Sequence, residues 1–537
     1  MSGSHDVCGM ESIAFRWKAT VVCLSLVAAL TALAAGLTAS LSGRSEPPAR
    51  AVHVVHAEQS GLRLGLEALT GRVSLVASTP GLRWRIAGAT SWRQADGRVL
   101  VRGWDTTRLG DGQYRLELSD ATGAMTQGLS IRNVTPIVHS PLANASAGLD
   151  TRSTDGRAVV AVFARRSYRP GEVAVLHLAH RYPVVLLEIL HVGPEQKLTI
   201  GNETIEGVTV AGPFLLTGGR ETIRVRIGHW ESGLYAARLS APGRLGFAPF
   251  VLRPAALGTN RVAVVQPTNT WQAYNYRDAN GDGRPDTWYY DSSFTTVDMS
   301  RPFLDRGVPP HFRAYDLGFL RWLCHTGKHV DMLSQEDLER IPGDRLAQLY
   351  RLIVFPGHHE YVTEAEYNAV QRFRDLGGNL AFLSANNFFS RVNRDGDRIT
   401  RIGRWRDLGR PESALVGVQY FDWNHGKPAQ PFIVTAAADT SWLFAGTGLA
   451  AGANLGWFGI EVDERTVASP ASAHVLATIP DAFGDHRPAE MIFYRTARGA
   501  NVFAAGAFTL AGPDARTSTV SRMLENLWQR LAAENGV

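Results

Sequence analysis

The chain has 537 residues, of which 45% are hydrophobic and 20% charged, which indicates two or three globular domains and excludes collagen-like, coiled-coil and wholly disordered proteins. Its net charge of +5 comes from scattered arginines, with only four lysines, so we exclude nucleic acid as a partner. Three cysteines are too few for a disulfide scaffold.

The N-terminus carries an apolar run over residues 19–41, preceded by Lys18 and followed by a polar stretch. The run predicts an export signal within residues 1–45. It is long enough to span a bilayer, which takes roughly 20 residues, while Ala32 and Ala34 provide the small residues of a cleavage site. A cleaved signal peptide and an inner-membrane anchor therefore both stay open. In either case we expect a periplasmic or secreted protein that meets the membrane only through this segment.

From residue 51 to about 253, short runs of alternating apolar and polar residues are separated by glycine-containing turns, as in 98–102 and 114–118. This pattern predicts strands, and their regular spacing favours β-sandwiches. We expect two immunoglobulin-like modules, over residues 51–135 and 155–255. A segment with proline and alanine near residues 253–258 then marks a domain boundary.

Beyond the boundary, residues 261–266 and 352–355 are continuous apolar runs, typical of strands buried on both faces of a parallel sheet. Thr363 and Glu366 have the spacing of a helix capping box, Gly377 suits the helix end, and a third strand is expected at 379–383. Strand, helix and strand predict a parallel sheet. The expected fold class is therefore α/β plus all-β, with the α/β domain over residues 258–537.

Ligands bind outside the carboxyl ends of strands in open α/β sheets. After the strand at 352–355 come His358 and Glu360, which offer one nitrogen and one carboxylate to a metal ion or a reacting water. The alternative is structural, with Glu360 at the positive end of the following helix and His358 as a loop residue. Both interpretations stay open on spacing alone.

Four motifs together resemble one family. They are SGLYAARL (232–239), TWQAYNY (270–276), GHHEYVT (357–363) and a longer stretch from SWLF to GIEVD (441–463). This set resembles the large (beta) subunit of N,N-dimethylformamidase. The resemblance implies a glutamine-amidotransferase-like, flavodoxin-like parallel-sheet domain beside β-sandwich elements. It also implies a mononuclear, ferric iron, held by two tyrosines and a glutamate with a histidine nearby, that activates water for amide hydrolysis.

Carried over by position, the resemblance assigns the iron to Tyr235, Tyr274 and Glu360. Tyr276 competes with Tyr274 for its place. His358 and Glu360 become the catalytic pair, and Glu461 of GIEVD is expected behind the ligands. A structural role stays open for Tyr235, as a sandwich-corner residue, and for Tyr274, as a packing partner of Trp271.

A second candidate metal site is independent of the family. Oxygen-bearing side chains stand at positions 1, 3, 5 and 9 of a loop with glycine at position 6, which is the spacing at which one loop gathers oxygens around calcium. Position 12 is Tyr289, which departs from an EF-hand. The alternative is a solvated turn. The four residues are Asp278, Asn280, Asp282 and Asp286.

Two functions of different classes follow. The first is an exported, metal-dependent hydrolase that acts on an amide or another C–N bond of a small molecule. The resembling enzyme is intracellular and works with a small partner subunit, so the need for such a subunit stays open for this chain. The second is a non-catalytic binding protein that recognises a glycan or protein through its β modules and calcium loop. A thiol nucleophile is disfavoured, because Cys324 lies in an expected helix at 317–325.

Overall fold

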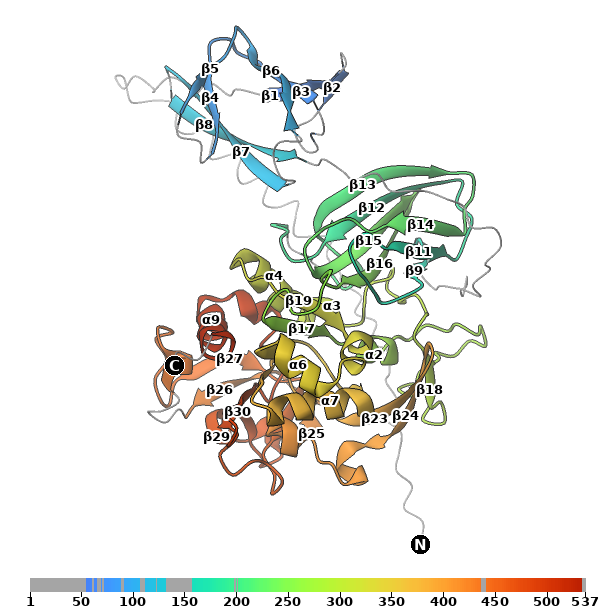
Figure 1. The fold of residues 1–537 in the computed structure, drawn as a ribbon, viewed down its shortest axis with the longest axis vertical. Coiled ribbons are helices and arrows are strands. Elements are labelled where there is room, and N and C mark those ends of the chain that lie inside the picture. Colours follow the sequence, from blue (N-terminus) through green and yellow to red (C-terminus); the bar gives the residue numbers. More distant parts are fainter. Residues whose placement is uncertain are drawn as a thin grey trace, which may run out of the picture.

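The fold was taken from a computed structural model of the chain (Figure 1). It describes residues 55–59, 62–64, 69, 72–87, 91–106, 112–121, 123–131, 157–197, 199, 201–435 and 441–533. The predicted export segment, residues 1–45 with the apolar run 19–41, lies outside these ranges. Among the residues described, none of the helices combines the length and apolarity that a membrane span requires.

The first module consists of two four-stranded antiparallel sheets, with strand orders β2-β1-β3-β6 and β5-β4-β7-β8. Alternating side chains such as Leu116 and Leu118 of β7 point between the sheets and are fully buried, as the sequence pattern predicts. The strands are β1 (Val55–Gln59), β2 (Leu62–Leu64), β3 (Arg72–Ala77), β4 (Arg83–Ile86), β5 (Arg93–Gln94), β6 (Val99–Asp105), β7 (Gly112–Asp120) and β8 (Gly123–Ile131).

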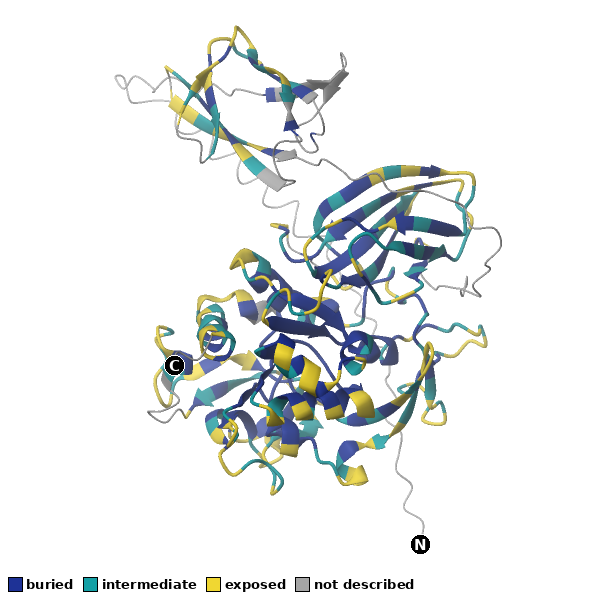
Figure 2. Cartoon of the chain, viewed as in Figure 1, coloured by how far each residue is buried: buried dark blue, intermediate teal, exposed yellow. Residues whose placement is uncertain are grey.

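The second module packs a five-stranded sheet, β10-β16-β15-β12-β13, on a three-stranded sheet, β14-β11-β9. Its core is a separate cluster of buried apolar side chains, and the dark blue segments of its strands in Figure 2 mark buried residues. The strands are β9 (Ala161–Phe163), β10 (Ser167–Tyr168), β11 (Val173–Leu178), β12 (Val184–His191), β13 (Val208–Thr217), β14 (Thr222–Arg226), β15 (Gly233–Ala241) and β16 (Arg244–Leu252).

The third part is built on a nine-stranded sheet in the order β19-β17-β20-β22-β31-β30-β29-β26-β27. Its first five strands run parallel and the other four continue it antiparallel. The strands are β17 (Val262–Gln266), β19 (Asp331–Ser334), β20 (Leu352–Phe355), β22 (Asn379–Phe382), β26 (Gln430–Val434), β27 (Asn454–Phe458), β29 (His474–Ile479), β30 (Ala489–Arg495) and β31 (Asn501–Ala504).

Two smaller sheets flank the large one, and both faces of the large sheet are covered by helices with buried apolar sides. The small-sheet strands are β18 (Thr296–Asp298), β21 (Tyr361–Thr363), β23 (Ser390–Asp395), β24 (Arg398–Arg404), β25 (Gln419–Trp423) and β28 (Glu461–Glu464). The helices are α2 (Thr268–Ala273), α3 (Phe312–Tyr315), α4 (Leu317–His325), α5 (Gln335–Glu339), α6 (Gly343–Leu349), α7 (Glu364–Asp375), α8 (Ser413–Val416) and α9 (Ser518–Ala532), with the 3-10 helices η2 (Trp405–Leu408), η3 (Ser441–Phe444), η4 (Ala482–Gly484) and η5 (Pro513–Arg516).

Most of the regular secondary structure in the described residues is β-strand, as expected for immunoglobulin-like modules. The strands predicted at 261–266, 352–355 and 379–383 are present, and so are the helices after Thr363 and at 317–325. The Thr363 hydroxyl accepts a hydrogen bond from the Glu366 amide, as predicted. The Glu366 carboxylate accepts one from the Gln335 side chain, so the capping box is not completed. A flavodoxin-like assignment and the domain boundaries 51–135, 155–255 and 258–537 stay predictions.

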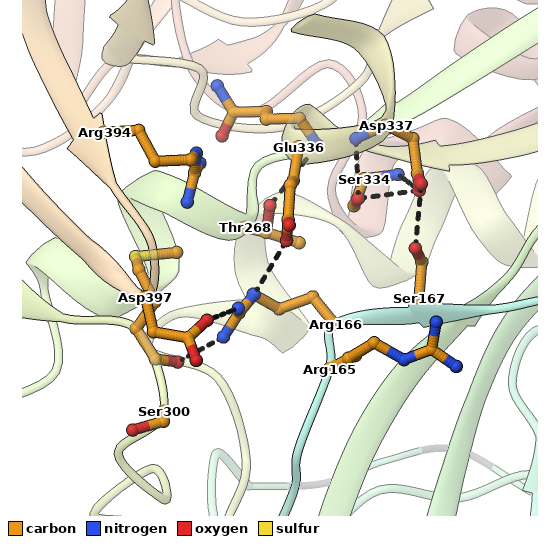
Figure 3. A network of polar contacts seen from close by, with 12 residues as sticks. Arg165, Arg166, Ser167, Thr268, Ser300, Ser334, Glu336, Asp337, Arg394 and Asp397 are labelled. Atoms are coloured by element: carbon orange, nitrogen blue, oxygen red, sulfur yellow. Dashed lines mark hydrogen bonds and ion pairs between the residues drawn. The ribbon is translucent and has the colours of Figure 1, made fainter. Parts of the chain in front are cut away.

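A polar network joins the second module to the third part (Figure 3). Arg166, between β9 and β10, pairs with Glu336 of α5 and with Asp397 of the β23–β24 turn, and it donates to the Met299 carbonyl at 3.0 Å. Ser167 donates to Asp337 at 2.9 Å. The Arg166 and Glu336 side chains are only 12% and 17% exposed, so solvent screens this pair weakly, whereas Asp397 is half exposed.

Arg166→Ala should therefore destabilise the joint. The change removes a donor from the Met299 carbonyl and from the Asp397 carboxylate, and it leaves Glu336 with Arg340 as its partner, so we expect the free energy of unfolding to fall by about 1–3 kcal/mol, as measured by urea denaturation. Arg181→Ala is the matched control, because Arg181 forms a single exposed pair with Glu221 and its loss should change little. Equal midpoints for the two variants would contradict the structural role of Arg166.

Candidate functional site

The candidate site lies where β20 ends. The chain turns at Gly357 and then places His358, His359 and Glu360 in the interior before Tyr361 opens β21. His358 is 5% exposed and Glu360 4% exposed. The segment is therefore at the carboxyl end of a parallel strand, the edge at which α/β sheets bind ligands.

Helix α2, which follows the neighbouring strand β17, holds this segment in place. The Thr270 hydroxyl accepts a hydrogen bond from the Glu360 amide at 3.1 Å, and the Asn269 side-chain amide donates to the Tyr361 carbonyl at 3.1 Å. Tyr274 comes directly after the helix. These bonds fix the two strand ends against each other, although the sequence did not predict the helix.

Two tyrosine hydroxyls donate hydrogen bonds to the Glu360 carboxylate. The Tyr274 hydroxyl donates to Glu360 Oε2 at 2.9 Å, and the Tyr289 hydroxyl donates to the same atom at 2.7 Å. The two tyrosine rings stack with their centroids 4.1 Å apart. Tyr361 extends the cluster, since its hydroxyl lies 2.5 Å from that of Tyr289.

His358 lies between two carboxylates. Its Nε2 is 3.4 Å from Glu360 Oε2 and 3.1 Å from Glu461 Oε2, which β28 contributes. His358 Nε2 and Glu461 Oε2 are both buried, and neither has a hydrogen bond of acceptable geometry. Buried polar atoms in this state are rare in folded proteins and mark a place for a further group.

Burial sets the protonation of the cluster. It raises the pKa of the Tyr274 and Tyr289 hydroxyls well above the ordinary value, and the Glu360 charge raises both further. Burial also raises the pKa of Glu360, which His358 partly offsets. Burial alone would lower the pKa of His358, but Glu461 and Glu360 outweigh it and raise that pKa. A multivalent cation would relieve this concentration of anionic groups.

An aromatic wall closes the site on one side. The Phe508 ring packs edge-on to His358 with centroids 4.9 Å apart, and Tyr315 packs against Phe508 at 4.5 Å. His311 stacks on Tyr315 at 5.1 Å. These rings come from segments far apart in the sequence, and the motifs did not point to them.

The structure does not bring Tyr235 to this cluster. Tyr235 lies in β15, faces the core of the second module, and donates its hydroxyl to the Glu231 carbonyl at 2.8 Å. Its ring stacks on His191. We therefore correct the assignment of Tyr235 beside Glu360, since strand alternation aims this side chain into a β-sandwich. Tyr276, the competing choice to Tyr274, is 41% exposed and has no contact with Glu360.

Tyr289 lies beside Glu360, where the resemblance led us to expect Tyr235, and sequence reasoning missed it. The only signal was its place at position 12 of the candidate calcium loop, where a metal-binding glutamate stands in an EF-hand. The loop thus delivers a side chain to the site even though its own oxygens point elsewhere.

The side-chain oxygens of the candidate calcium loop accept hydrogen bonds from backbone amides of the same loop. The Asp286 carboxylate accepts from the amides of Ala279 and Asn280, and the Asp278 carboxylate accepts from the amides of Gly281 and Gly283. The remaining two side chains do the same, with Asn280 accepting from the Asp282 amide and Asp282 from the Arg284 amide. Calcium binding by this loop stays a prediction.

The cluster fits a hard cation. Phenol and carboxylate oxygens are the donors that a ferric ion prefers, and three of them converge at one buried point. Within the described ranges, no three His, Cys, Asp or Glu side chains form a metal-binding group. An ion held here would therefore depend on the phenol oxygens of Tyr274 and Tyr289 in addition to Glu360.

Solved structures resemble the chain only weakly. A biofilm-associated protein BSP domain has 8% sequence identity and a TM-score of 0.12, and the match covers 36% of this chain and 29% of that chain. A Dscam isoform structure has 12% identity and a TM-score of 0.11, over 39% and 47%. The titin domains Z1Z2 in complex with telethonin have 13% identity and a TM-score of 0.11, over 35% and 92%. The chain thus spans less than half the length of the first two, and scores this low carry no argument.

No curated protein matches the chain. A family described as N,N-dimethylformamidase beta subunit-like, C-terminal, matches residues 220–512, more than half of the 537 residues. The matched region contains Tyr274, Tyr289, His358, Glu360 and Glu461. The match confirms the resemblance that the four motifs indicated, and the chain belongs to the N,N-dimethylformamidase beta subunit-like family.

Proposed function

We propose that the chain is a metal-dependent hydrolase that cleaves an amide or a related C–N bond of a small molecule. The observation that carries the proposal is the convergence of two phenol hydroxyls on one buried carboxylate oxygen, with an imidazole 3.4 Å from that oxygen. The family supports the reaction class.

Tyr274, Tyr289 and Glu360 would hold the ion, which we propose to be ferric iron. When bound, such an ion supplies Lewis acidity that polarises a carbonyl and lowers the pKa of water. The three side chains come from the end of α2, the segment before β18 and the end of β20, and the hydrogen bond from the Glu360 amide to the Thr270 hydroxyl ties the first and last of these segments together. Pre-positioned oxygens of this kind need little rearrangement to bind a cation.

His358 holds the proton of the reaction. Its Nε2 lies between Glu360 and Glu461, both of which favour the imidazolium form and raise the pKa of the ring. A buried imidazolium can donate this proton to a leaving amine, and the proton that the attacking water loses would restore it. Phe508 and Tyr315 exclude bulk water from the same face of the ring.

Three further features belong to the proposal. A glutamine-amidotransferase-like arrangement is supported by the five parallel strands with helices on both faces. A small partner subunit is supported by the words "beta subunit-like" in the family description. An exported, periplasmic or secreted location is supported by the apolar run 19–41.

Metal content tests the ligand set. We expect about one iron per purified chain by elemental analysis, together with the visible absorption of phenolate bound to ferric iron. Glu360→Ala should remove most of the metal, and Tyr289→Phe and Tyr274→Phe should each weaken binding and reduce the absorption, because each removes one oxygen donor.

Tyr235→Phe and Tyr276→Phe are the matched controls and should keep both the iron and the absorption. If wild-type protein lacks transition metal after expression with iron, or if Tyr235→Phe loses iron while Tyr289→Phe keeps it, the ligand set is wrong. Absence of metal and of amide hydrolysis in the wild type would leave the binding-protein hypothesis as the better one.

The role of His358 has its own test. His358→Gln should lower kcat for small amides by about 10²- to 10⁴-fold, because general acid–base catalysis contributes a factor of this size. Metal content should stay at the wild-type level, since His358 is not one of the three ligands. A variant with full kcat would show that the proton resides elsewhere.

Gly357→Ala tests whether the segment after β20 has to pack closely against Asp316 and Pro267. A Cβ at Gly357 would lie 1.8 Å from Asp316 Oδ1 and 3.4 Å from Pro267 Cγ, so the segment 358–360 would have to move. We expect a loss of stability of about 1–3 kcal/mol together with reduced metal content. Gly403→Ala is the control, because a Cβ there meets no atom within 4 Å. Unchanged metal content in Gly357→Ala would contradict the described geometry.

A further inference from the structure

A cavity of about 620 Å³ lies between the second module and the third part, away from the candidate site. The segments that line it are the ends of β12 and β15, the linker after β16, and the chain from α4 to β19. None of the side chains of the candidate site lines it. Its volume falls in the range of pockets that hold small organic molecules, about 300–1,000 Å³.

The interior of the cavity is mainly apolar. Leu234 and Leu320 are 1% and 2% exposed, and Leu323 and Met332 are similarly buried. Trp230, which stacks on Tyr235 with centroids 5.4 Å apart, adds an aromatic side wall. Such a lining favours a ligand with a flat or branched hydrocarbon body.

His191 supplies the polar contact inside the cavity. Its ring stacks on Tyr235 at 4.6 Å, and no protein group in the described ranges hydrogen-bonds its nitrogens. Burial lowers the pKa of His191 to about 4, so the ring is neutral at physiological pH. A neutral imidazole offers one donor and one acceptor, and Nε2 lies beside Gly233, where no side chain blocks it.

The interior carries no free charge in the part of the chain described here. Burial raises the pKa of the Cys324 thiol to about 12, so the thiol is uncharged. The Lys328 ammonium is held by Glu525 at 2.9 Å. At the rim, Glu231 and His329 lie 3.6 Å apart, with both side chains mostly in solvent. A charged ligand would thus lose its hydration without meeting a free partner.

We propose that this cavity binds an uncharged aromatic molecule that carries an N–H or O–H group, with its rings against Trp230 and the leucines and its polar group on His191. The inference does not depend on the proposed function, because it shares no residue with the metal site. The bound molecule would contact the second module and α4 at once.

N-phenyl-1-naphthylamine is a suitable probe, because it is neutral, has one N–H donor, and fluoresces in apolar surroundings. With the full chain we expect a saturable fluorescence increase that fits one site. 8-Anilinonaphthalene-1-sulfonate has the same rings and an added sulfonate, and it should bind about tenfold more weakly or worse. Saturating probe should also slow the alkylation of Cys324 by N-ethylmaleimide, followed by mass spectrometry of the peptide that contains it.

Variants locate the site. Ala255 lines the cavity and is exposed, so Ala255→Trp should fill the mouth and weaken binding about tenfold, whereas its neighbour Ala256→Trp lies outside the lining and should bind normally. His191→Phe keeps the stacked ring and removes the nitrogens, so affinity should fall about threefold to tenfold with an unchanged melting temperature. Glu360→Ala should bind the probe like the wild type, which separates this inference from the metal site.

Several results would overturn the inference. These are non-saturable binding, equal affinity for the sulfonated probe, equal effects of Ala255→Trp and Ala256→Trp, or alkylation of Cys324 at the same rate with and without probe. Any of them would mean that the neutral aromatic ligand does not occupy this cavity.

Discussion

The buried carboxylate of Glu360 is the constraint on which the site depends. Burying a carboxylate that is only 4% exposed costs several kcal/mol of hydration free energy. Two phenol hydroxyls that donate hydrogen bonds and a nearby imidazole compensate for this loss. These partners come from separate segments. The ends of β20 and α2 and the stretch up to Tyr289 must therefore all be correctly placed before the buried carboxylate is stabilised. The donors are themselves buried, and burial raises the pKa of both hydroxyls well above the ordinary value, so they stay protonated and can donate to the carboxylate.

Local sequence signals predicted the framework of the site because they act over a few residues. Continuous apolar runs became β17 and β20, and the Thr363 cap with Gly377 bounded α7. The strand-end rule then led to His358 and Glu360, which do lie together. Glu461 was expected from a motif about 100 residues later, and β28 brings it to His358 at 3.1 Å. What could be predicted was therefore which strand ends matter.

The choice among tyrosines could not be predicted, because it depends on where distant segments lie. Tyr235 stands in a motif shared with the family, yet strand alternation in β15 directs it toward Phe250 and His191 in the core of the second module. Tyr289 stands in no motif and follows a turn-rich loop whose path is set by its own carboxylates. A motif reports that a position is constrained, and packing can constrain a tyrosine as strongly as metal binding.

Helix α4 runs from the candidate site to the cavity between the second module and the third part. The helix begins after Asp316, whose carboxylate accepts a hydrogen bond from Trp271 beside the site and faces Gly357. It ends at Cys324 and His325, and Cys324 lines the cavity. Burial raises the pKa of Asp316 to about 7, and the hydrogen bond from Trp271 and the charge of His358 partly offset this effect. Because a packed helix moves as a unit, a molecule that presses on Leu320 and Leu323 acts on the same element that positions Asp316. A Cβ at Gly357 would lie 1.8 Å from Asp316 Oδ1, so the strand end before His358 packs directly against the residue that precedes this helix.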